Sequence, residues 1–378
     1  MRLLQEAGEL RMTSKEVADA IEEIEVSKVA ELEGKLVQAR KDRDAARRQN
    51  GVLEQKVEEL EAALDIVKNI ETHTPIPPVW LTPEPKGKYH GIPVMLLTDT
   101  HFDEVVEPEE VMGLNAYNRQ IAEIRLRKAF EGAITIPNHW MGNNLKKDGF
   151  VLACGGDLIT GEIHDELTAT NESTITESLE YWLDPMIAGI RMLREEYGKV
   201  HVVAVDGNHD RFYKKKRSKK AARSSFSWLF WKVLARDFKK FKTVSFTIPD
   251  SRDVIFPVYE TRILLHHGDQ FRGGSGISGV VSPLHIGDYR KRRKHASAES
   301  YTGRKDLRFD IQIMGHFHHR NSLPGIITGG CLKGYDEYAM TGNFPFDEAS
   351  QELMIFTPEH GLTFQAPIYV QDKDDEGW

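Results

Sequence analysis

An apolar run in the middle of the chain, Val202-Val203-Ala204-Val205, leads directly into Asp206-Gly207-Asn208-His209-Asp210-Arg211. The run stops at a glycine turn and then presents an amide, an imidazole and a carboxylate in consecutive positions. A buried strand cannot carry these groups in its middle unless each polar atom has a partner. At the carboxyl end of a strand, however, they project into the crevice where open α/β sheets bind ligands. The sequence therefore predicts a buried strand that ends at a ligand-binding turn.

Four other apolar runs end in a similar way. Their polar ends are Asp99-Thr100-His101, Gly156-Asp157, His267-Gly268 and Gly315-His316-Phe317-His318. Alternate residues of a strand face the same side, which would bring both imidazoles of the last motif together. Each motif alone is weak evidence, since a single Asp-x-His or Gly-Asp pair more often caps a turn or lies on the surface. All five together predict one shared site.

The shared site has the ligand chemistry of a metal centre. The motifs supply two aspartates, one asparagine and four histidines as candidate ligands, with one further histidine beside them. Hard oxygens mixed with imidazoles, without a thiolate, suit manganese, iron or zinc in an open geometry. We expect two divalent ions, manganese first, with iron, zinc or magnesium as alternatives. Two ions about 3.5–4 Å apart can clamp a phosphoryl group and activate water near neutral pH.

In order and form, the motifs resemble those of the calcineurin-like metallophosphoesterase superfamily, across about residues 92–370. The resemblance implies an α/β fold in which two mixed β-sheets are sandwiched between helices. It implies that the first metal is held by the residues Asp99, His101, Asp157 and His318. The second metal would be held by Asp157, Asn208, His267 and His316. Asp157 would thus bridge the two ions.

The resemblance also implies a catalytic role for His209, which would contact the substrate phosphate and assist the leaving group. Asp210 is the second predicted catalytic residue, because it could orient His209. A role in capping the turn is an equal alternative for Asp210. We expect His209 to act without binding a metal.

The sequence departs from the family pattern in two places. Thr160 stands where many members carry an acid or a histidine, and His164 or Asp165 could supply a similar group. His266 is an alternative ligand to its neighbour His267. Strand alternation and the usual His-Gly context favour His267.

The first 74 residues predict a helical coiled coil that forms a homo-oligomer. Heptad positions a and d run from Val29 to Val67, and Asn50 occupies an a position. A single asparagine at a, with leucine commonest at d, favours a parallel dimer. A lone surface helix packed on its own domain is the alternative. The prolines of 75–88 predict a stiff linker, followed by a metallophosphoesterase domain at 89–378.

The formal net charge of −8 excludes a general polyanion binder, but two basic runs follow the ligand motifs. Residues 211–223 hold eight cationic residues and no acid, and 290–294 reads Arg-Lys-Arg-Arg-Lys. We expect both runs to be loops on the metal side, where they would attract a nucleic acid. The predicted substrate-binding residues are Arg211, Tyr213, Lys214, Lys215, Arg290 and Arg292.

These features together predict a metal-dependent DNA nuclease, similar to the repair exonucleases of the superfamily and consistent with a phage origin. A phosphoprotein phosphatase or a small-nucleotide phosphodiesterase is the alternative, and a non-catalytic scaffold is a third reading. Two distant cysteines, Cys154 and Cys331, indicate free thiols in a reducing compartment. We expect a cytoplasmic protein, since no secretion signal or membrane span is evident.

Overall fold

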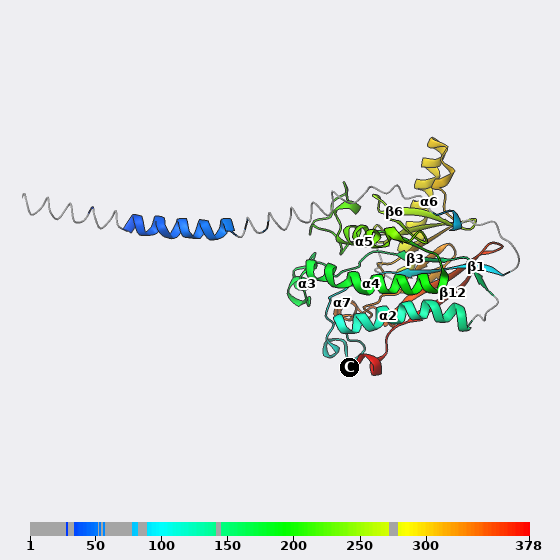
Figure 1. Ribbon diagram of the computed structural model, residues 1–378, viewed down its shortest axis with the longest axis horizontal. Coiled ribbons are helices and arrows are strands. Elements are labelled where there is room, and N and C mark those ends of the chain that lie inside the picture. Colours follow the sequence, from blue (N-terminus) through cyan, green and yellow to red (C-terminus); the bar gives the residue numbers. More distant parts are fainter. Residues whose placement is uncertain are drawn as a thin grey trace, which may run out of the picture. The chain divides into compact units, whose positions relative to one another are not determined.

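The computed structural model describes residues 28, 34–51, 53, 56, 78–81, 89–140, 145–271 and 279–378, in two units, Met1–Asn69 and Ile70–Trp378. In the first unit, residues 34–51 form a helix (Figure 1), and all of these residues are exposed. This helix contains the predicted heptad positions from Leu36 to Asn50. Most other positions of the predicted coil lie outside the described residues, so its pairing with a second copy stays a prediction.

The larger sheet of the second unit has seven strands, in the order β12-β11-β1-β3-β4-β5, with β2 beside β1. Its strands are β1 His90–Leu97, β2 Lys146–Lys147, β3 Phe150–Cys154, β4 Val200–Ala204, β5 Val244–Thr247, β11 Ser350–Thr357 and β12 Gly361–Tyr369. The first five are parallel, whereas β11 is antiparallel to both of its neighbours. The strands β1, β3 and β4 are buried along their whole length, as continuous apolar runs are in parallel sheets covered on both faces.

The smaller sheet has five strands, in the order β6-β7-β8-β10-β9. Its strands are β6 Asp253–Val258, β7 Thr261–His266, β8 Ile311–Met314, β9 Asn321–Leu323 and β10 Ile326–Thr328. β8 runs parallel to β7 and β10, and the outer pairs are antiparallel. Both sheets are therefore mixed.

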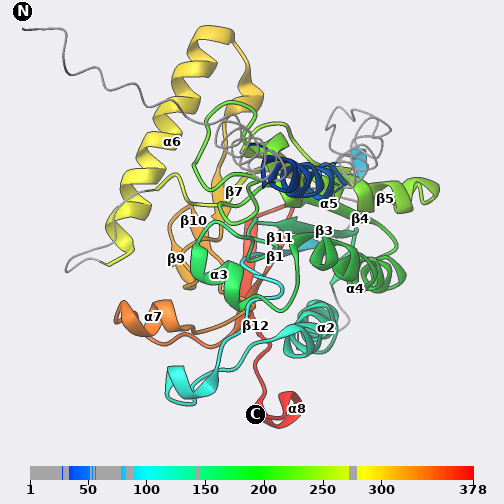
Figure 2. The same ribbon diagram turned by 90° about the vertical axis from the view of Figure 1, so that its left-hand side faces the viewer.

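Helices lie on the outer faces of the two sheets (Figure 2), and apolar side chains fill the layers between the elements. Val94 and Phe256 lie in the core between the sheets. The helices α2 Arg119–Thr135, α4 Ile175–Tyr197 and α5 Phe226–Asp237 cover the larger sheet, where Phe130 and Trp182 belong to the same core cluster. α6 Val281–Thr302 packs on the smaller sheet through Leu284. The predicted sandwich of two mixed sheets between helices is confirmed.

Shorter helices complete the described part of the second unit. They are η1 Val79–Leu81, η2 Pro108–Val111, η3 Ile136–Trp140, α3 Asp165–Thr170, η4 Ala222–Ser224, η5 Phe238–Lys240, η6 Lys305–Leu307, α7 Glu337–Thr341 and α8 Lys373–Glu376. Leu81, at the end of η1, is fully buried, and its carbonyl accepts a 2.7 Å hydrogen bond from the Tyr259 amide. The segment 79–81 of the predicted linker therefore packs onto the globular unit.

One local prediction is wrong, because Arg290 and Arg292 lie in the helix α6 and not in a loop. Residues 288–302 contain neither proline nor glycine, so nothing interrupts the helical hydrogen bonds. The helix ends at Gly303, which takes the left-handed conformation that commonly terminates helices. Among the described helices, none combines the length and the apolar character needed to cross a membrane.

Candidate metal centre

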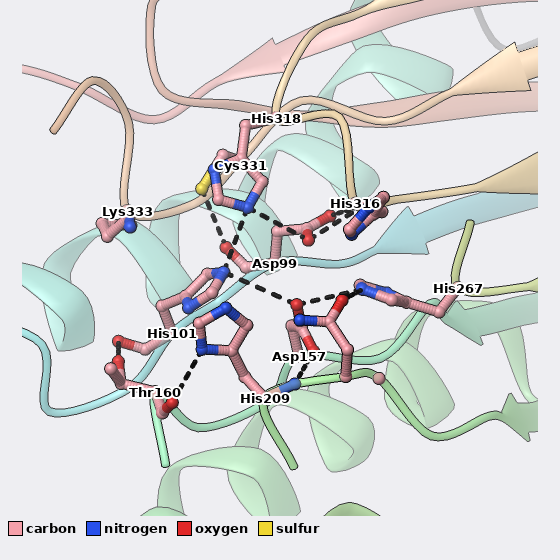
Figure 3. Close-up of polar contacts among 12 residues, drawn as sticks. Asp99, His101, Asp157, Thr160, His209, His267, His316, His318, Cys331 and Lys333 are labelled. Carbon is pink, nitrogen blue, oxygen red and sulfur yellow. Dashed lines mark hydrogen bonds and ion pairs between the residues drawn. The ribbon is translucent and has the colours of Figure 1, made fainter. Parts of the chain in front are cut away.

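The predicted polar strand ends meet at one edge of the sandwich (Figure 3). Asp99 and His101 follow β1, and Asp157 follows β3. Asn208 follows β4 of the same sheet, while the histidines at 267, 316 and 318 follow β7 and β8 of the other sheet. Parallel strands bring their carboxyl ends to one edge, which explains why residues so far apart in the sequence converge.

The converging ligand atoms form two groups. Asp99, His101 and His318 offer ligand atoms that all lie within 4.8 Å of one another, as do Asp157, His267 and His316. In the first group, the Nε2 atoms of His101 and His318 are 3.1 Å apart. In the second group, His267 Nε2 lies 2.9 Å from Asp157 Oδ2.

One further contact links the two groups, and another adds Asn208 to the second group. Asp157 Oδ2 is also 3.9 Å from His101 Nε2, so this carboxylate lies between the two groups. Asn208 Oδ1 is 3.0 Å from His267 Nε2. The structure thus brings together all seven predicted ligand residues.

The orientation of the imidazoles fits a pair of cations. His267 Nδ1 lies 2.9 Å from the Gly155 carbonyl oxygen and donates to it, which leaves Nε2 as the ligand atom that faces Asp157. A second hydrogen bond of this kind is how proteins usually orient a metal-binding histidine. His101 Nδ1 lies 3.4 Å from the Glu104 carboxylate but forms no hydrogen bond with a described residue. This nitrogen and oxygen donor set suits divalent transition metals.

The backbone is unusual at the ligand positions. Five of the ligands have left-handed backbone angles, with φ of 50° at Asp99, 45° at His101, 50° at Asp157, 73° at His316 and 52° at His318. Such conformations cost about 1–3 kcal/mol each in residues other than glycine, and they persist at functional sites. Gly207 allows the loop after β4 to approach the loop after β3 closely, because a Cβ at Gly207 would lie 2.0 Å from the Asp157 carboxylate.

The pKa of each candidate ligand depends on the charges of its neighbours. Burial opposes a charge on His267, but the Asp157 carboxylate outweighs burial and raises the pKa of His267 to about 10. Burial likewise opposes ionisation of Asp157, and the neighbouring histidines nevertheless hold the pKa of Asp157 well below its ordinary value. Burial lowers the pKa of His316 to about 4. Because a bound cation would displace the proton of His267, metal affinity should rise with pH.

His209 lies over the first group of ligands without belonging to it. Its ring centroid is 4.7 Å from that of His101, and its backbone amide donates to Asp157 Oδ1 at 2.7 Å. Its Nδ1 is 2.9 Å from the carbonyl oxygen of Thr160. Burial lowers the pKa of His209. The Thr160 carbonyl, and not the side chain of Asp210, therefore orients this ring.

Asp210 instead fixes the turns beneath the site. Its fully buried carboxylate accepts hydrogen bonds from the backbone amides of Asp157, Leu158 and Gly207, each at 2.9 Å. The amide of Ile159 donates a fourth bond, at 3.2 Å. These contacts favour the turn-capping alternative over the orienting role that was predicted for Asp210.

The three other residues that the sequence left as alternatives, His164, Asp165 and His266, have different surroundings in the structure. His266 shares a 3.0 Å hydrogen bond with Gln312 and belongs to neither group of candidate ligands, whereas His267 belongs to the second group. The ring centroid of His164 is 5.7 Å from that of His209, close enough for a supporting role. Asp165 forms an exposed ion pair with Lys214.

Sequence reasoning missed the groups behind His101. Lys333 is almost fully buried, and its ammonium lies 2.8 Å from the Glu104 carboxylate and 2.5 Å from that of Asp336. The Glu104 carboxylate also accepts a hydrogen bond from the Thr160 hydroxyl at 3.1 Å. Cys331 is buried beside them and donates from its thiol to the Asp99 carbonyl at 3.1 Å. The one sequence signal was a lysine inside an apolar, glycine-rich segment, 329–334.

The predicted substrate-binding residues have different roles. The guanidinium of Arg211 donates to the backbone carbonyls of Asn208, Tyr213 and Lys214, so it organises its own loop. Arg292 is likewise occupied, by the carboxylate of Asp288 and by two backbone carbonyls.

The remaining members of this set face solvent. Tyr213 lies under the guanidinium of Arg217, whose carbon is 3.5 Å from the ring centroid. Lys215 and Arg290 are exposed, and no hydrogen bond or ion pair joins either to another described residue. Sequence alone shows where charges lie, whereas these contacts show which charges remain available.

The fold and the site define a class of proteins in which two mixed sheets hold adjacent clusters of histidines and carboxylates at their strand ends. The profile of the family described as calcineurin-like phosphoesterase matches residues 92–320, and the chain belongs to this family. Membership indicates a metal-dependent phosphoester hydrolase, and the family typically uses two divalent metals. The motif-based assignment to this family is confirmed.

Several solved structures are similar to this chain. A dimetal phosphatase from Danio rerio is 12% identical, with 74% of this chain and 99% of that chain covered and a TM-score of 0.32. Vacuolar protein sorting 29 from Cryptosporidium parvum is 14% identical, with 74% and 98% covered and a TM-score of 0.31. No curated protein sequence matches the chain.

Proposed function

We propose that the protein is a metal-dependent nuclease that hydrolyses phosphodiester bonds of DNA, as the exonucleases of its family do. The observation that carries this proposal is the basic segment 211–223, which begins directly after the ligand turn at Asn208. Its eight cationic residues are accompanied by no acid within the segment. A concentration of positive charge beside a phosphoesterase site favours a polyanionic substrate.

The contacts of this segment support a substrate-binding loop. Arg211 ties the loop to the ligand turn through the Asn208 carbonyl, which fixes the position of the lysines that follow. Residues 212–220 are exposed. A pocket beside Asn208 is lined by Tyr213, Lys215 and Arg217 of this loop, among others. Cationic and aromatic side chains together are suited to the phosphates and bases of a nucleic acid.

The residues of the centre can be assigned roles in this reaction. When bound by the two ligand groups, divalent ions, with manganese expected first, would neutralise the phosphoryl oxygens and activate water. His209 would hydrogen-bond to the substrate through Nε2, because Thr160 occupies its Nδ1. A bound phosphate would raise the lowered pKa of His209 and favour the protonated ring, which can donate to the leaving oxygen.

A substrate panel tests the proposal. The full chain, loaded with manganese, is assayed on end-labelled single-stranded and duplex DNA, a cyclic nucleotide, a phosphopeptide and a small chromogenic diester. We expect DNA cleavage that falls steeply with salt, whereas hydrolysis of the small diester changes little. The variant Asp157→Asn serves as the inactive control. Hydrolysis of the phosphopeptide or the cyclic nucleotide without cleavage of DNA would overturn the proposal.

A further inference from the structure

The helix α6 is fixed beside the metal centre by its first half. Leu284 of this helix belongs to a core cluster with Phe271 and Met314, and Phe317 packs against the cluster. Phe271 follows the ligand His267 by four residues, and Phe317 lies between two ligands. Gly287 permits the close contact, since a Cβ there would lie 2.4 Å from the ring of Phe271. The helix therefore begins at the loops that carry the second group of ligands.

The opposite side of α6 forms a continuous exposed stripe. Its members are spaced by three or four residues, which places them on one face of a helix. We call this face the α6 stripe, and its residues are Ile286, Tyr289, Arg290, Arg293, Ser297, Ser300 and Tyr301. Tyr289 is 64% exposed and Tyr301 is 93% exposed, although large aromatic side chains are usually more buried. The stripe therefore presents aromatic as well as cationic side chains to solvent.

The charges of α6 show which cations remain available. Its two acids lie on the side of the helix away from the stripe, and both are paired, Asp288 with Arg292 and Glu299 with Arg308. The two lysines of the basic run 290–294, Lys291 and Lys294, both form ion pairs with the carboxylate of Asp253. Within the described part of the chain, Arg290 and Arg293 alone of this run form no hydrogen bond or ion pair. Both project from the stripe into solvent.

We propose that the α6 stripe docks duplex DNA, with α6 lying in the major groove and its arginines contacting the phosphates or base edges. This inference rests on the proposed nuclease function and names the form of its substrate. A helix about 10–12 Å wide fits a major groove about 12 Å wide. Ser297 and Ser300 have small side chains in the C-terminal part of the stripe, where the backbone of α6 can approach the bases closely.

The length and the position of α6 agree with this role. Its 22 residues span about 33 Å, close to one turn of B-DNA at about 34 Å. Figures 1 and 2 both show the C-terminal turns of α6, in yellow, extending beyond the neighbouring strands. A duplex bound along the stripe would meet the ligand loops at the start of the helix. The cationic loop 211–223 then contacts the strand that enters the centre.

Charge reversal on the stripe tests the inference in the full chain. We compare Arg290→Glu/Arg293→Glu with the wild type in fluorescence anisotropy with a labelled duplex, in EDTA so that no cleavage occurs. Each lost phosphate contact should weaken binding about 8-fold at 0.1 M salt, so the double variant should bind about 60-fold more weakly. The slope of log affinity against log salt should fall by about 2.

The matched control carries the same change of charge at the opposite edge of the sheet. Arg191→Glu/Lys199→Glu alters two exposed residues near the end of α4 and the start of β4, and should bind like the wild type. Arg290→Ala/Arg293→Ala removes the charges without reversing them. Circular dichroism and hydrolysis of the small diester verify that each variant folds with an intact centre.

The outcomes separate the two proposals. Weaker duplex binding by the α6 variants alone, with unchanged hydrolysis of the small diester, supports docking. Unchanged duplex binding by a protein that cleaves DNA overturns the role of α6 and leaves the nuclease in place. Loss of single-strand binding with unchanged duplex binding also overturns it. A wild type that hydrolyses the diester but neither binds nor cleaves DNA overturns the proposed function itself.

Discussion

Replacing Lys333 by methionine should destabilise the globular unit strongly. The ammonium of Lys333 lies 2.8 Å from the Glu104 carboxylate and 2.5 Å from that of Asp336. All three side chains are at least nine-tenths buried, with relative exposures of 3%, 9% and 7%. Methionine keeps the apolar stem of the lysine and removes its charge. Two buried carboxylates would then face each other without a cation between them.

The size of the effect follows from these distances. One ion pair at 2.8 Å contributes about 6 kcal/mol at an effective dielectric constant of about 20. The cost of burying the lysine charge offsets part of this attraction. Breaking a buried pair by removing one partner usually costs about 3–5 kcal/mol, and we expect the same decrease in the free energy of unfolding here.

Urea unfolding of the full chain in a chelator measures this decrease. Tryptophan fluorescence is a suitable signal because all six tryptophans lie at or after Trp80, outside the predicted coil. The triple variant Glu104→Gln/Lys333→Met/Asp336→Asn removes every charge of the network and should recover at least half of the lost stability. A decrease below about 1 kcal/mol for Lys333→Met would refute the reasoning, since buried pairs cost more than this when broken.

Two further predictions concern the site and its surroundings, and a third concerns the N-terminal helix. His209→Ala should lower turnover on DNA about 10²–10⁴-fold and leave metal content, measured by elemental analysis, nearly unchanged; loss of metal together with activity would contradict the assigned role. Burial opposes ionisation of Asp336, but Lys333 outweighs it and lowers the pKa of Asp336 to about 2 from its ordinary 3.8. The charged form is therefore favoured in the folded state, and about 2 kcal/mol of stability should be present above pH 4 and lost as the pH falls through about 2. Asp336→Asn should lack this acid-dependent loss in urea titrations at several pH values. Deletion of residues 1–74 should give a protein that is monomeric by light scattering and remains active in the substrate assays. A fragment that stays dimeric would argue against the coil as the dimer contact.

The sequence was sufficient where local pattern and chemistry coincide. Each predicted ligand follows an apolar run, and parallel strands carry such ends to a common edge whatever their separation along the chain. The residue pattern alone therefore places Asp99 and Asp157 in one site. The choice of His267 over His266 also followed from strand alternation, and in the structure His267 contacts Asp157 whereas His266 contacts Gln312.

Other features depend on contacts that no local pattern records. Glu104 and Lys333 are 229 residues apart, and neither belongs to a motif. Arg211 looks like a substrate residue by charge, yet its donors are used by backbone carbonyls of its own loop. Residues 290–294 were predicted to form a loop but lie in a helix. The prediction failed because a run of basic residues gives no information on the backbone conformation. Charge can be read from a sequence, but the availability of that charge cannot.

The left-handed backbone of the ligand positions restricts how this protein can lose its activity during evolution. At Asp99 and Asp157, most other side chains would cause about 1–2 kcal/mol of backbone strain, and without a bound metal no metal–ligand bond would compensate for this strain. Glycine and asparagine adopt this conformation most readily. Inactive descendants should therefore carry glycine or asparagine at these positions far more often than alanine or valine. The left-handed turns would be retained after metal binding and hydrolysis are lost. This substitution pattern would therefore identify a relative that has the same fold but no longer hydrolyses phosphoesters.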